Sequence, residues 1–330
     1  MIKLLIACHK PAYVPPNALL APIQVGAALA ARRFPGMLQD DDGDNISAKN
    51  PQYCELTAQY WAWKNLDAEY YGFFHYRRYL AFDRIYPVGA DGTIQGKHLR
   101  PYRELDRICG DLSAYGLTEE RMEAVIRQYD LLAVLREPLN VSVQRQFEQY
   151  HDPRMLRELM VILQERYPDY VPAAEAYLQG KQAYYMNMFV MKRELFYTYA
   201  AWLFDLLGAL EEQLQVQGAE EKKTLASQQF PDRMMGYLGE RLFGIFYTYQ
   251  RQQGLRCAEL PYLMFYNTTP AENGGEPTED AETDTNTNAQ VRSFRLKPTP
   301  FCIKVDMRKL NRLFPAGSRR RLWLRSLFLR

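Results

Sequence analysis

Apolar positions follow two different spacings along the chain, and each spacing predicts one kind of element. The run from Ile2 to Cys8 is almost continuously apolar, which is typical of a strand buried on both faces of a parallel sheet. Residues 55–66 carry large apolar side chains at helical spacing, and they lead into a second apolar strand at residues 69–75. A helix therefore feeds a strand at the start of the chain.

The same order recurs further on. Thr118 is a suitable N-cap for a helix over 118–128, and an apolar strand at 129–135 follows. Further helices are expected over 153–180, 193–213 and 233–250, with a strand at 185–191. This alternation predicts an α/β fold with a mostly parallel sheet, in which ligands bind beyond the carboxyl ends of the strands.

The composition changes abruptly after residue 267. Residues 268–292 contain six acids and no aromatic residue, so we expect an acidic disordered linker there. Residues 293–330 are predicted to form a short strand at 301–305 and then a basic tail. Residues 308–330 contain eight basic residues and no acid, so they carry a charge of +8. Since the net charge of the whole chain is +2, residues 1–307 carry a net charge of −6.

Leucine, phenylalanine and tryptophan interleave with the arginines of residues 308–330. That composition favours an amphipathic helix on an anionic membrane surface. A helix docked on the body of the protein is the alternative. A nucleic-acid partner is not expected, because the apolar half would have no role there.

The whole-chain composition is that of a folded globular protein, with 47% hydrophobic and 24% charged residues among 330. The apolar run at residues 1–9 is too short for a signal peptide, and no window resembles a membrane span, so we expect a cytoplasmic protein. Five cysteines without CxxC pairing and four scattered histidines predict reduced thiols and no zinc site.

Three polar clusters follow predicted strands. His9 and Lys10 could meet a phosphate or a base edge, or form a surface loop. Asp40–Asp44 could bind a metal ion, although an acidic turn explains it equally well. In the third cluster, Arg77 and Arg78 are costly to place at a strand end unless they meet an anion, which favours a diphosphate over pairing with the Asp cluster or backbone carbonyls.

Nine segments together resemble the bacterial family catalogued as domain of unknown function 4422, whose members include glycosyltransferases of capsule, exopolysaccharide and O-antigen synthesis, among them galactofuranosyltransferases. The segments are His9-Lys10, Pro22–Ala28, Asp41–Ser47, Asn50, Tyr53–Thr57, Tyr60–Asn65, Gly72–Tyr79, Asn187–Met191 and Gly239–Leu242. The resemblance covers about residues 1–267. It implies a glycosyltransferase-A-like fold, with a nucleotide-sugar half over about 1–135 and an acceptor half over about 136–267.

The resemblance also implies a donor site, and this sequence departs from the usual one. Where the fold commonly carries a metal-binding Asp-x-Asp motif, this chain has His75-Tyr76-Arg77-Arg78. We therefore expect metal-independent transfer without a cofactor, the alternative being Mn²⁺ or Mg²⁺ held by Asp42 and Asp44. The expected diphosphate ligands are His75, Arg77, Arg78, His9 and Lys10, and the expected nucleoside ligands are Asp41, Asp42, Asp44 and Asn45.

Inverting transfer needs a general base near the acceptor hydroxyl. Glu240 is the first candidate and Asp232 the second, and the alternative for Glu240 is a simple ion pair with Arg241. Asn187 and Tyr76 are candidates for contact with the sugar or acceptor. A structural hydrogen bond is the other interpretation of Asn187, whose amide lies in an apolar segment.

These inferences predict a hexosyltransferase that moves a sugar from a nucleotide sugar to a lipid-linked glycan in cell-surface polysaccharide synthesis. We expect a UDP-sugar donor, of which UDP-galactofuranose is the family's example. We also expect the protein to lie peripherally on the inner face of the cytoplasmic membrane. The alternatives are a non-catalytic scaffold with a nucleotide-sugar fold and a metal-dependent phosphohydrolase.

Overall fold

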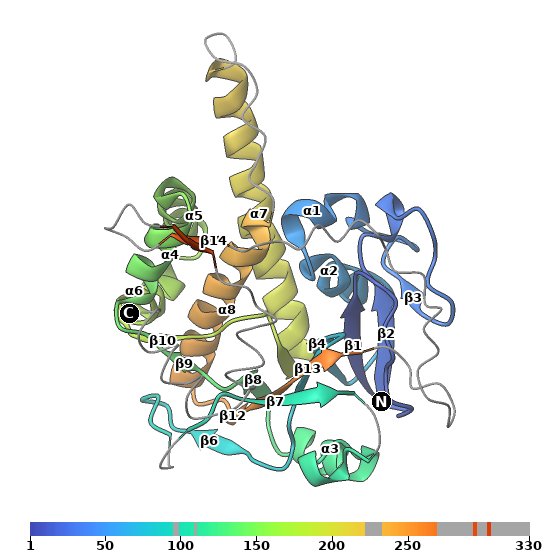
Figure 1. Cartoon of the computed structure of the whole chain (residues 1–330). Coiled ribbons are helices and arrows are strands. Elements are labelled where there is room, and N and C mark those ends of the chain that lie inside the picture. Colours follow the sequence, from blue (N-terminus) through green and yellow to red (C-terminus); the bar gives the residue numbers. More distant parts are fainter. Residues whose placement is uncertain (95–98, 109–110, 222–232, 269–292, 296–301, 305–330) are drawn as a thin grey trace. The chain divides into compact units, whose positions relative to one another are not determined.

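A computed structural model describes residues 1–94, 99–108, 111–221, 233–268, 293–295 and 302–304 (Figure 1). The chain divides into two compact units, Met1–Pro270 and Ala271–Arg330. The first holds the sheet, the helices and the candidate site. In the second, β14 (Ser293–Arg295) and β15 (Cys302–Lys304) pair antiparallel.

Eleven of the described strands form one sheet, whose main path runs in the order β3-β2-β1-β4-β11-β8-β12-β6. Along that path the bounds are β3 (Leu38–Gln39), β2 (Leu20–Gln24), β1 (Ile2–Cys8), β4 (Tyr70–His75), β11 (Phe189–Lys192), β8 (Leu131–Val134), β12 (Cys257–Leu260) and β6 (Tyr86–Val88). Three strands extend from β4, namely β5 (Arg78–Leu80), β13 (Tyr262–Asn267) and β7 (Tyr102–Arg107). A separate pair is formed by β9 (Glu137–Pro138) and β10 (Gln182–Ala183).

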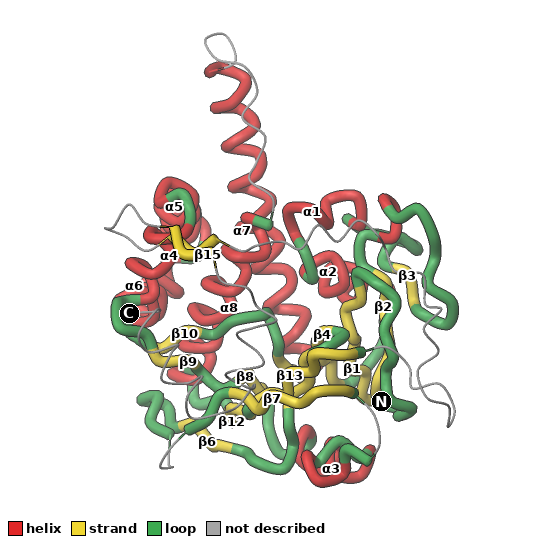
Figure 2. The backbone as a smooth tube through the Cα atoms, in the orientation of Figure 1, coloured by secondary structure: helices red, strands yellow, loops and turns green. Residues whose placement is uncertain are grey.

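Helices cover the sheet and link its strands (Figure 2). The α-helices are α1 (Asn50–Tyr53), α2 (Leu56–Asn65), α3 (Glu119–Ile126), α4 (Val143–Tyr150), α5 (Pro153–Arg166), α6 (Val171–Gln179), α7 (Arg193–Glu221) and α8 (Met234–Gln252). The short 3₁₀ helices are η1 (Ala27–Leu29), η2 (Ser47–Lys49), η3 (Ser113–Tyr115) and η4 (Pro168–Tyr170). In the described residues, no helix is both long and apolar enough to cross a membrane.

The predicted α/β class and mostly parallel central sheet are confirmed. β3, β2, β1 and β4 are mutually parallel, and β8 is parallel to β12. β11 lies between these two groups and runs antiparallel to both β4 and β8. Because it is reversed, its first residues lie at the edge where the parallel strands end.

The strand predicted over 185–191 is correct only in its second half. β11 begins at Phe189, whereas Met186 and Asn187 have φ values of 72° and 50° and form a left-handed turn. The helix predicted over 153–180 is divided into α5, η4 and α6, with Pro168 at the break. The predicted linker beyond Thr268 and the tail 305–330 lie outside the described residues.

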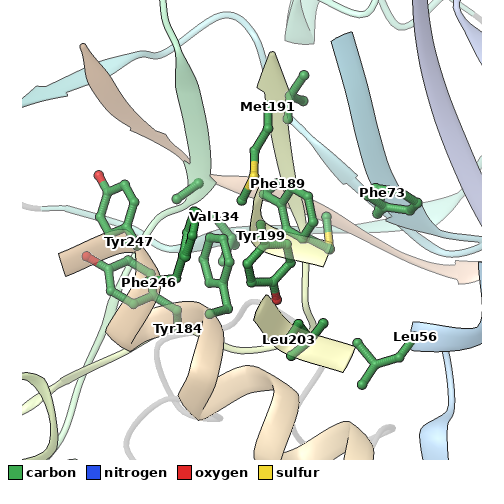
Figure 3. Close-up of a cluster of buried hydrophobic side chains, with 14 of the residues drawn as sticks. Leu56, Phe73, Val134, Tyr184, Phe189, Met191, Tyr199, Leu203, Phe246 and Tyr247 are labelled. Carbon is green, nitrogen blue, oxygen red and sulfur yellow. The ribbon is translucent and has the colours of Figure 1, made fainter. Parts of the chain in front are cut away.

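The hydrophobic core includes a group of buried side chains from β11, α7 and α8 (Figure 3). Phe189 of β11 stacks on Phe243 of α8 with ring centroids 5.2 Å apart, and Tyr199 of α7 meets Phe189 edge-on. All three rings are fully buried. At about 25 cal/mol per Å² of buried apolar surface, rings of this size are the main contributors to core stability.

Asp40 organises the loops beyond β1, β2 and β3. Its buried carboxylate accepts hydrogen bonds from the backbone N–H groups of Gly26 (2.8 Å) and Ala27 (2.9 Å), and from the hydroxyls of Ser47 and Thr57. Four donors satisfy a charge that would otherwise be costly to bury. The carboxylate thus joins the end of β2 to η2 and α2, and it is a structural group.

Replacing Asp40 should therefore weaken the fold. We expect Asp40→Ala to lower the free energy of unfolding by about 3 kcal/mol, because several buried donors lose a charged partner. Asp42→Ala is the matched control in the same turn, and it should change stability by less than about 0.5 kcal/mol, since its side chain is exposed. Urea denaturation measures both, and equal effects would contradict the assignment.

Candidate functional site

The candidate site lies at the carboxyl edge of the first parallel strands. β1 ends at Cys8 and β4 ends at His75, and Ala7 and His75 are paired across the two strands. The N–H of Tyr76 donates to the carbonyl of Ala7 at 3.1 Å. The pairing brings the His9-Lys10 and His75–Arg78 segments, which are far apart in the sequence, to one place.

Basic groups gather around the ring of Tyr76. The ring of His9 meets it edge-on at 4.9 Å between centroids, the Lys10 ammonium lies 5.3 Å from its centroid and the Arg77 guanidinium 5.8 Å. Burial, together with Lys10 and Arg77, lowers the pKa of His9. The structure therefore brings together His9, Lys10 and Arg77, which were expected from the sequence to bind the diphosphate.

Arg77 and Arg78 are partly buried without an acidic partner. Both Nε atoms are buried and make no hydrogen bond. Burial, and then the charge of Arg77, lowers the pKa of Arg78. Across the part of the chain that the structure describes, no carboxylate forms an ion pair with Lys10, Arg77 or Arg78. Adjacent buried cations without a counter-ion are costly unless an anion binds.

Arg233 is a fifth basic group that the sequence analysis missed. It precedes α8 with a left-handed backbone (φ 69°), and its N–H donates to the carbonyl of Pro51 at 2.7 Å. Its charge contributes to the lowered pKa of both His9 and His75. Nothing in its sequence neighbourhood marked it, because only tertiary packing places the start of α8 beside β1 and β4.

His75 is a neutral hydrogen-bonding group. Its Nε2 atom lies 2.7 Å from the carbonyl oxygen of Met186. The pKa of His75 is lowered to about 4, chiefly by burial and also by the charges of Arg78 and Arg77, whereas the hydrogen bond to Met186 raises it. At neutral pH the ring is uncharged, so Nε2–H donates to the carbonyl and His75 holds the turn that precedes β11.

Strained backbone concentrates at this place. The non-glycine residues with positive φ among those described are Cys54, Met186, Asn187 and Arg233. Asn187 donates to the carbonyl of Gly236 (3.2 Å), which lies one turn beyond Arg233. The Cys54 thiol lies close enough to Arg233 for the arginine's charge to act on its pKa. Such conformations cost about 1–3 kcal/mol each and are typical of functional sites.

Asn187 supports this turn from inside the protein. Its amide nitrogen donates to Glu55 Oε1 (2.8 Å) and to the carbonyl of Gly236, and the residue is 2% exposed. The structure thus shows the structural hydrogen bond that the sequence analysis gave as the alternative to contact with sugar hydroxyls. Glu55, which precedes α2, is a carboxylate of the site that the sequence analysis did not single out.

Glu240 lies on α8 directly behind the same turn. Its Oε1 accepts from the N–H of Met186 (2.6 Å) and its Oε2 from Arg241 (2.7 Å). The pKa of Glu240 is raised to about 7, chiefly by burial and also by nearby Glu55, whereas Arg241 and the bond from Met186 lower it. A carboxylate with a pKa near neutrality can accept a proton at physiological pH. Asp232, the second candidate base, lies outside the described residues.

The acidic segment that follows β3 is a hydrogen-bonded turn. Asp41 pairs with Arg33, Asp44 accepts from Tyr60 (3.2 Å), and the Asn45 amide donates to the carbonyls of Asp41 and Gly43. In the residues that the structure places, no three His, Cys, Asp or Glu side chains stand together as a metal site. Asp42 and Asp44 are the exposed carboxylates of this turn.

Comparison with known proteins identifies the chain's relatives. Residues 3–252 match the family model described as domain of unknown function (DUF4422). A solved structure titled as the apo form of WbbM, a bifunctional glycosyltransferase, superposes with a TM-score of 0.68 at 29% identity. The match covers 84% of this chain and 48% of that one, so the chain spans about half the length of its structural relative. None of the curated proteins matches.

The neutral state assigned to His75 gives a direct prediction. Its pKa is lower in the folded protein than the ordinary 6.5. It therefore adds stability above about pH 6.5, and this contribution is lost as the pH falls toward 4. Nitrogen-15 NMR of labelled histidine should show a neutral ring at pH 5.5. A ring that titrates near pH 6.5 would contradict the buried hydrogen bond.

Proposed function

We propose, from the premise that this chain belongs to the family described as domain of unknown function (DUF4422), that it is a glycosyltransferase using a nucleotide-sugar donor. The glycosyltransferase-like fold supports this assignment. The observation that carries it is a group of cations at the carboxyl edge, formed by Lys10, Arg77 and Arg78 with Arg233 beside them. No carboxylate among the described residues forms an ion pair with Lys10, Arg77 or Arg78. This is the edge where open α/β sheets bind ligands.

The diphosphate of the donor supplies the missing counter-charge. Guanidinium groups pair bidentately with phosphate oxygens, and fixed cations stabilise the negative charge that develops on the leaving nucleoside diphosphate. In this proposal Arg77, Arg78, Lys10 and His9 contact the diphosphate. Neutral His75 positions the turn beside the diphosphate. The ring of Tyr76 contacts the cationic side chains and would face the donor sugar. Transfer then proceeds without a metal ion.

The nucleoside is assigned to the turn after β3. Asp41 and Asn45 fix the shape of this turn, and the exposed Asp42, with Asp44, offers carboxylate oxygens that can accept hydrogen bonds from a ribose or a uracil ring. The proposed donor is a UDP-sugar, with UDP-galactofuranose the first to test. Mn²⁺ or Mg²⁺ bound by Asp42 and Asp44 is the competing arrangement.

Glu240 is the proposed general base of an inverting reaction. It would take the proton of the acceptor hydroxyl as that oxygen bonds to the anomeric carbon, while the bond from that carbon to the diphosphate breaks. The proposed acceptor is a lipid-linked glycan at the inner face of the cytoplasmic membrane. Residues 308–330, which lie outside the described residues, would bring the protein to that surface through basic and apolar side chains.

Nucleotide titration tests the donor site. We expect UDP to bind in EDTA, and Arg77→Ala to raise its Kd about 10- to 100-fold, since a charged hydrogen bond contributes about 1.5–3 kcal/mol. The exposed Arg166→Ala, which removes an arginine from a surface ion pair with Asp205, is the matched control and should bind as wild type. Binding that requires Mn²⁺ would move the site to the Asp turn.

The pH dependence of turnover tests Glu240. As the base must be deprotonated, kcat/KM should rise with pH up to a plateau above pH 7, with about a tenfold deficit one pH unit below the pKa. Glu240→Gln should lose this rise and about 10²–10⁴-fold in kcat. The exposed Glu123→Gln is the control. Normal turnover by Glu240→Gln would exclude Glu240, and UDP binding without turnover by the wild type would favour the scaffold.

A further inference from the structure

Aromatic rings gather near Glu240, between α8 and the end of α4. His151 lies between two of them, with its ring centroid 4.3 Å from Tyr237 of α8 and 4.8 Å from the buried Phe147 of α4. Tyr237 precedes Glu240 by one helical turn. The rings therefore begin within a turn of the proposed base and extend from α8 to the end of α4.

Tyr185 and Tyr150 continue the same surface. Tyr185 immediately precedes Met186, whose N–H is bonded to Glu240, and its ring centroid lies 5.5 Å from the Arg241 guanidinium. The pKa of Tyr185 is raised to about 12, chiefly by burial and also by nearby Glu240, Glu137 and Tyr150, whereas Arg241 lowers it. Tyr150 is 73% exposed, while Tyr185, His151 and Tyr237 are half-buried. Large exposed aromatic side chains are typical of binding surfaces.

Arg241 fixes these rings in place. It is 2% exposed and bonds to Glu240, to the Gln146 amide oxygen and to the carbonyl of Tyr237. Its guanidinium lies 5.3 Å from the centroid of Phe147. One buried cation thus holds the proposed base, the end of α4 and Tyr185 in a single arrangement, so the ring positions are set relative to Glu240.

We propose that Tyr150, Tyr185 and Tyr237, supported by His151 between Tyr237 and Phe147, form a platform on which a sugar ring of the acceptor stacks. A hexose presents C–H groups on its faces and hydroxyls on its rim, which match flat rings bordered by a tyrosine hydroxyl and by the carboxylates of Glu137 and Glu240. This inference rests on the proposed function. It adds the acceptor subsite and places it beside Glu240, with the Arg233 guanidinium 5.7 Å from the ring centroid of Tyr237.

Saturation-transfer NMR with octyl β-D-galactoside, octyl β-D-glucoside and octyl N-acetyl-β-D-glucosaminide tests the platform in the full-length protein saturated with UDP. We expect signal on the sugar-ring protons for at least one of these probes. Tyr237→Ala and Tyr150→Ala should each raise its Kd by about tenfold or more. Tyr150→Phe, which keeps the ring, should stay within about threefold of wild type.

The control is Tyr197→Ala, which removes a tyrosine 38% exposed at the start of α7. UDP binding in the same samples separates the two proposals. If UDP binds but none of the three glycosides does, or if Tyr150→Ala binds them as wild type, the platform is wrong and the donor site stands. If UDP itself does not bind the wild type, the proposed function fails first. Tyr150 is exposed enough that its replacement should not unfold the protein.

Discussion

The reversed direction of β11 is the constraint on which the site depends. A strand that ran parallel to its neighbours would begin at the opposite edge of the sheet. Because β11 runs antiparallel to β4 and β8, its first residues meet the ends of β1 and β4. The left-handed turn at Met186 and Asn187 then lies where His75, Glu55 and Glu240 can hold it through three hydrogen bonds.

Two charge environments result from this arrangement. At the donor end of the turn, Arg77 and Arg78 have no acidic partner among the described residues, which favours an anionic ligand. Behind it, Glu240 is buried beside one arginine and near a second carboxylate, so its pKa rises toward neutrality. The turn at Met186 and Asn187 thus separates a surface suited to a leaving diphosphate from Glu240, a group suited to accepting a proton. Asp40, which resembled a ligand in the sequence, instead stabilises the loops around both.

The fold could be predicted largely from local pattern, whereas the site could not. The apolar spacing of residues 55–66 and 69–75 specifies α2 and β4. The Arg pair after β4 points directly to the proposed anion site, because charge at a buried strand end is visible in one segment. Three features needed tertiary information. Met186 and Asn187 look like strand in an apolar run, Arg233 follows a segment without a clear pattern, and Glu55 gains its environment only when Asn187 folds against it. The family resemblance pointed to Glu240, whereas its raised pKa follows from tertiary packing.

The most direct measurement is a crystal structure of the protein with UDP, grown in EDTA. The account predicts the diphosphate within hydrogen-bond distance of the guanidinium groups of Arg77 and Arg78, with the uridine toward the turn that contains Asp42. A nucleotide bound elsewhere, or one whose phosphates reach the protein only through a metal ion on Asp42 and Asp44 after Mn²⁺ is added, would contradict it.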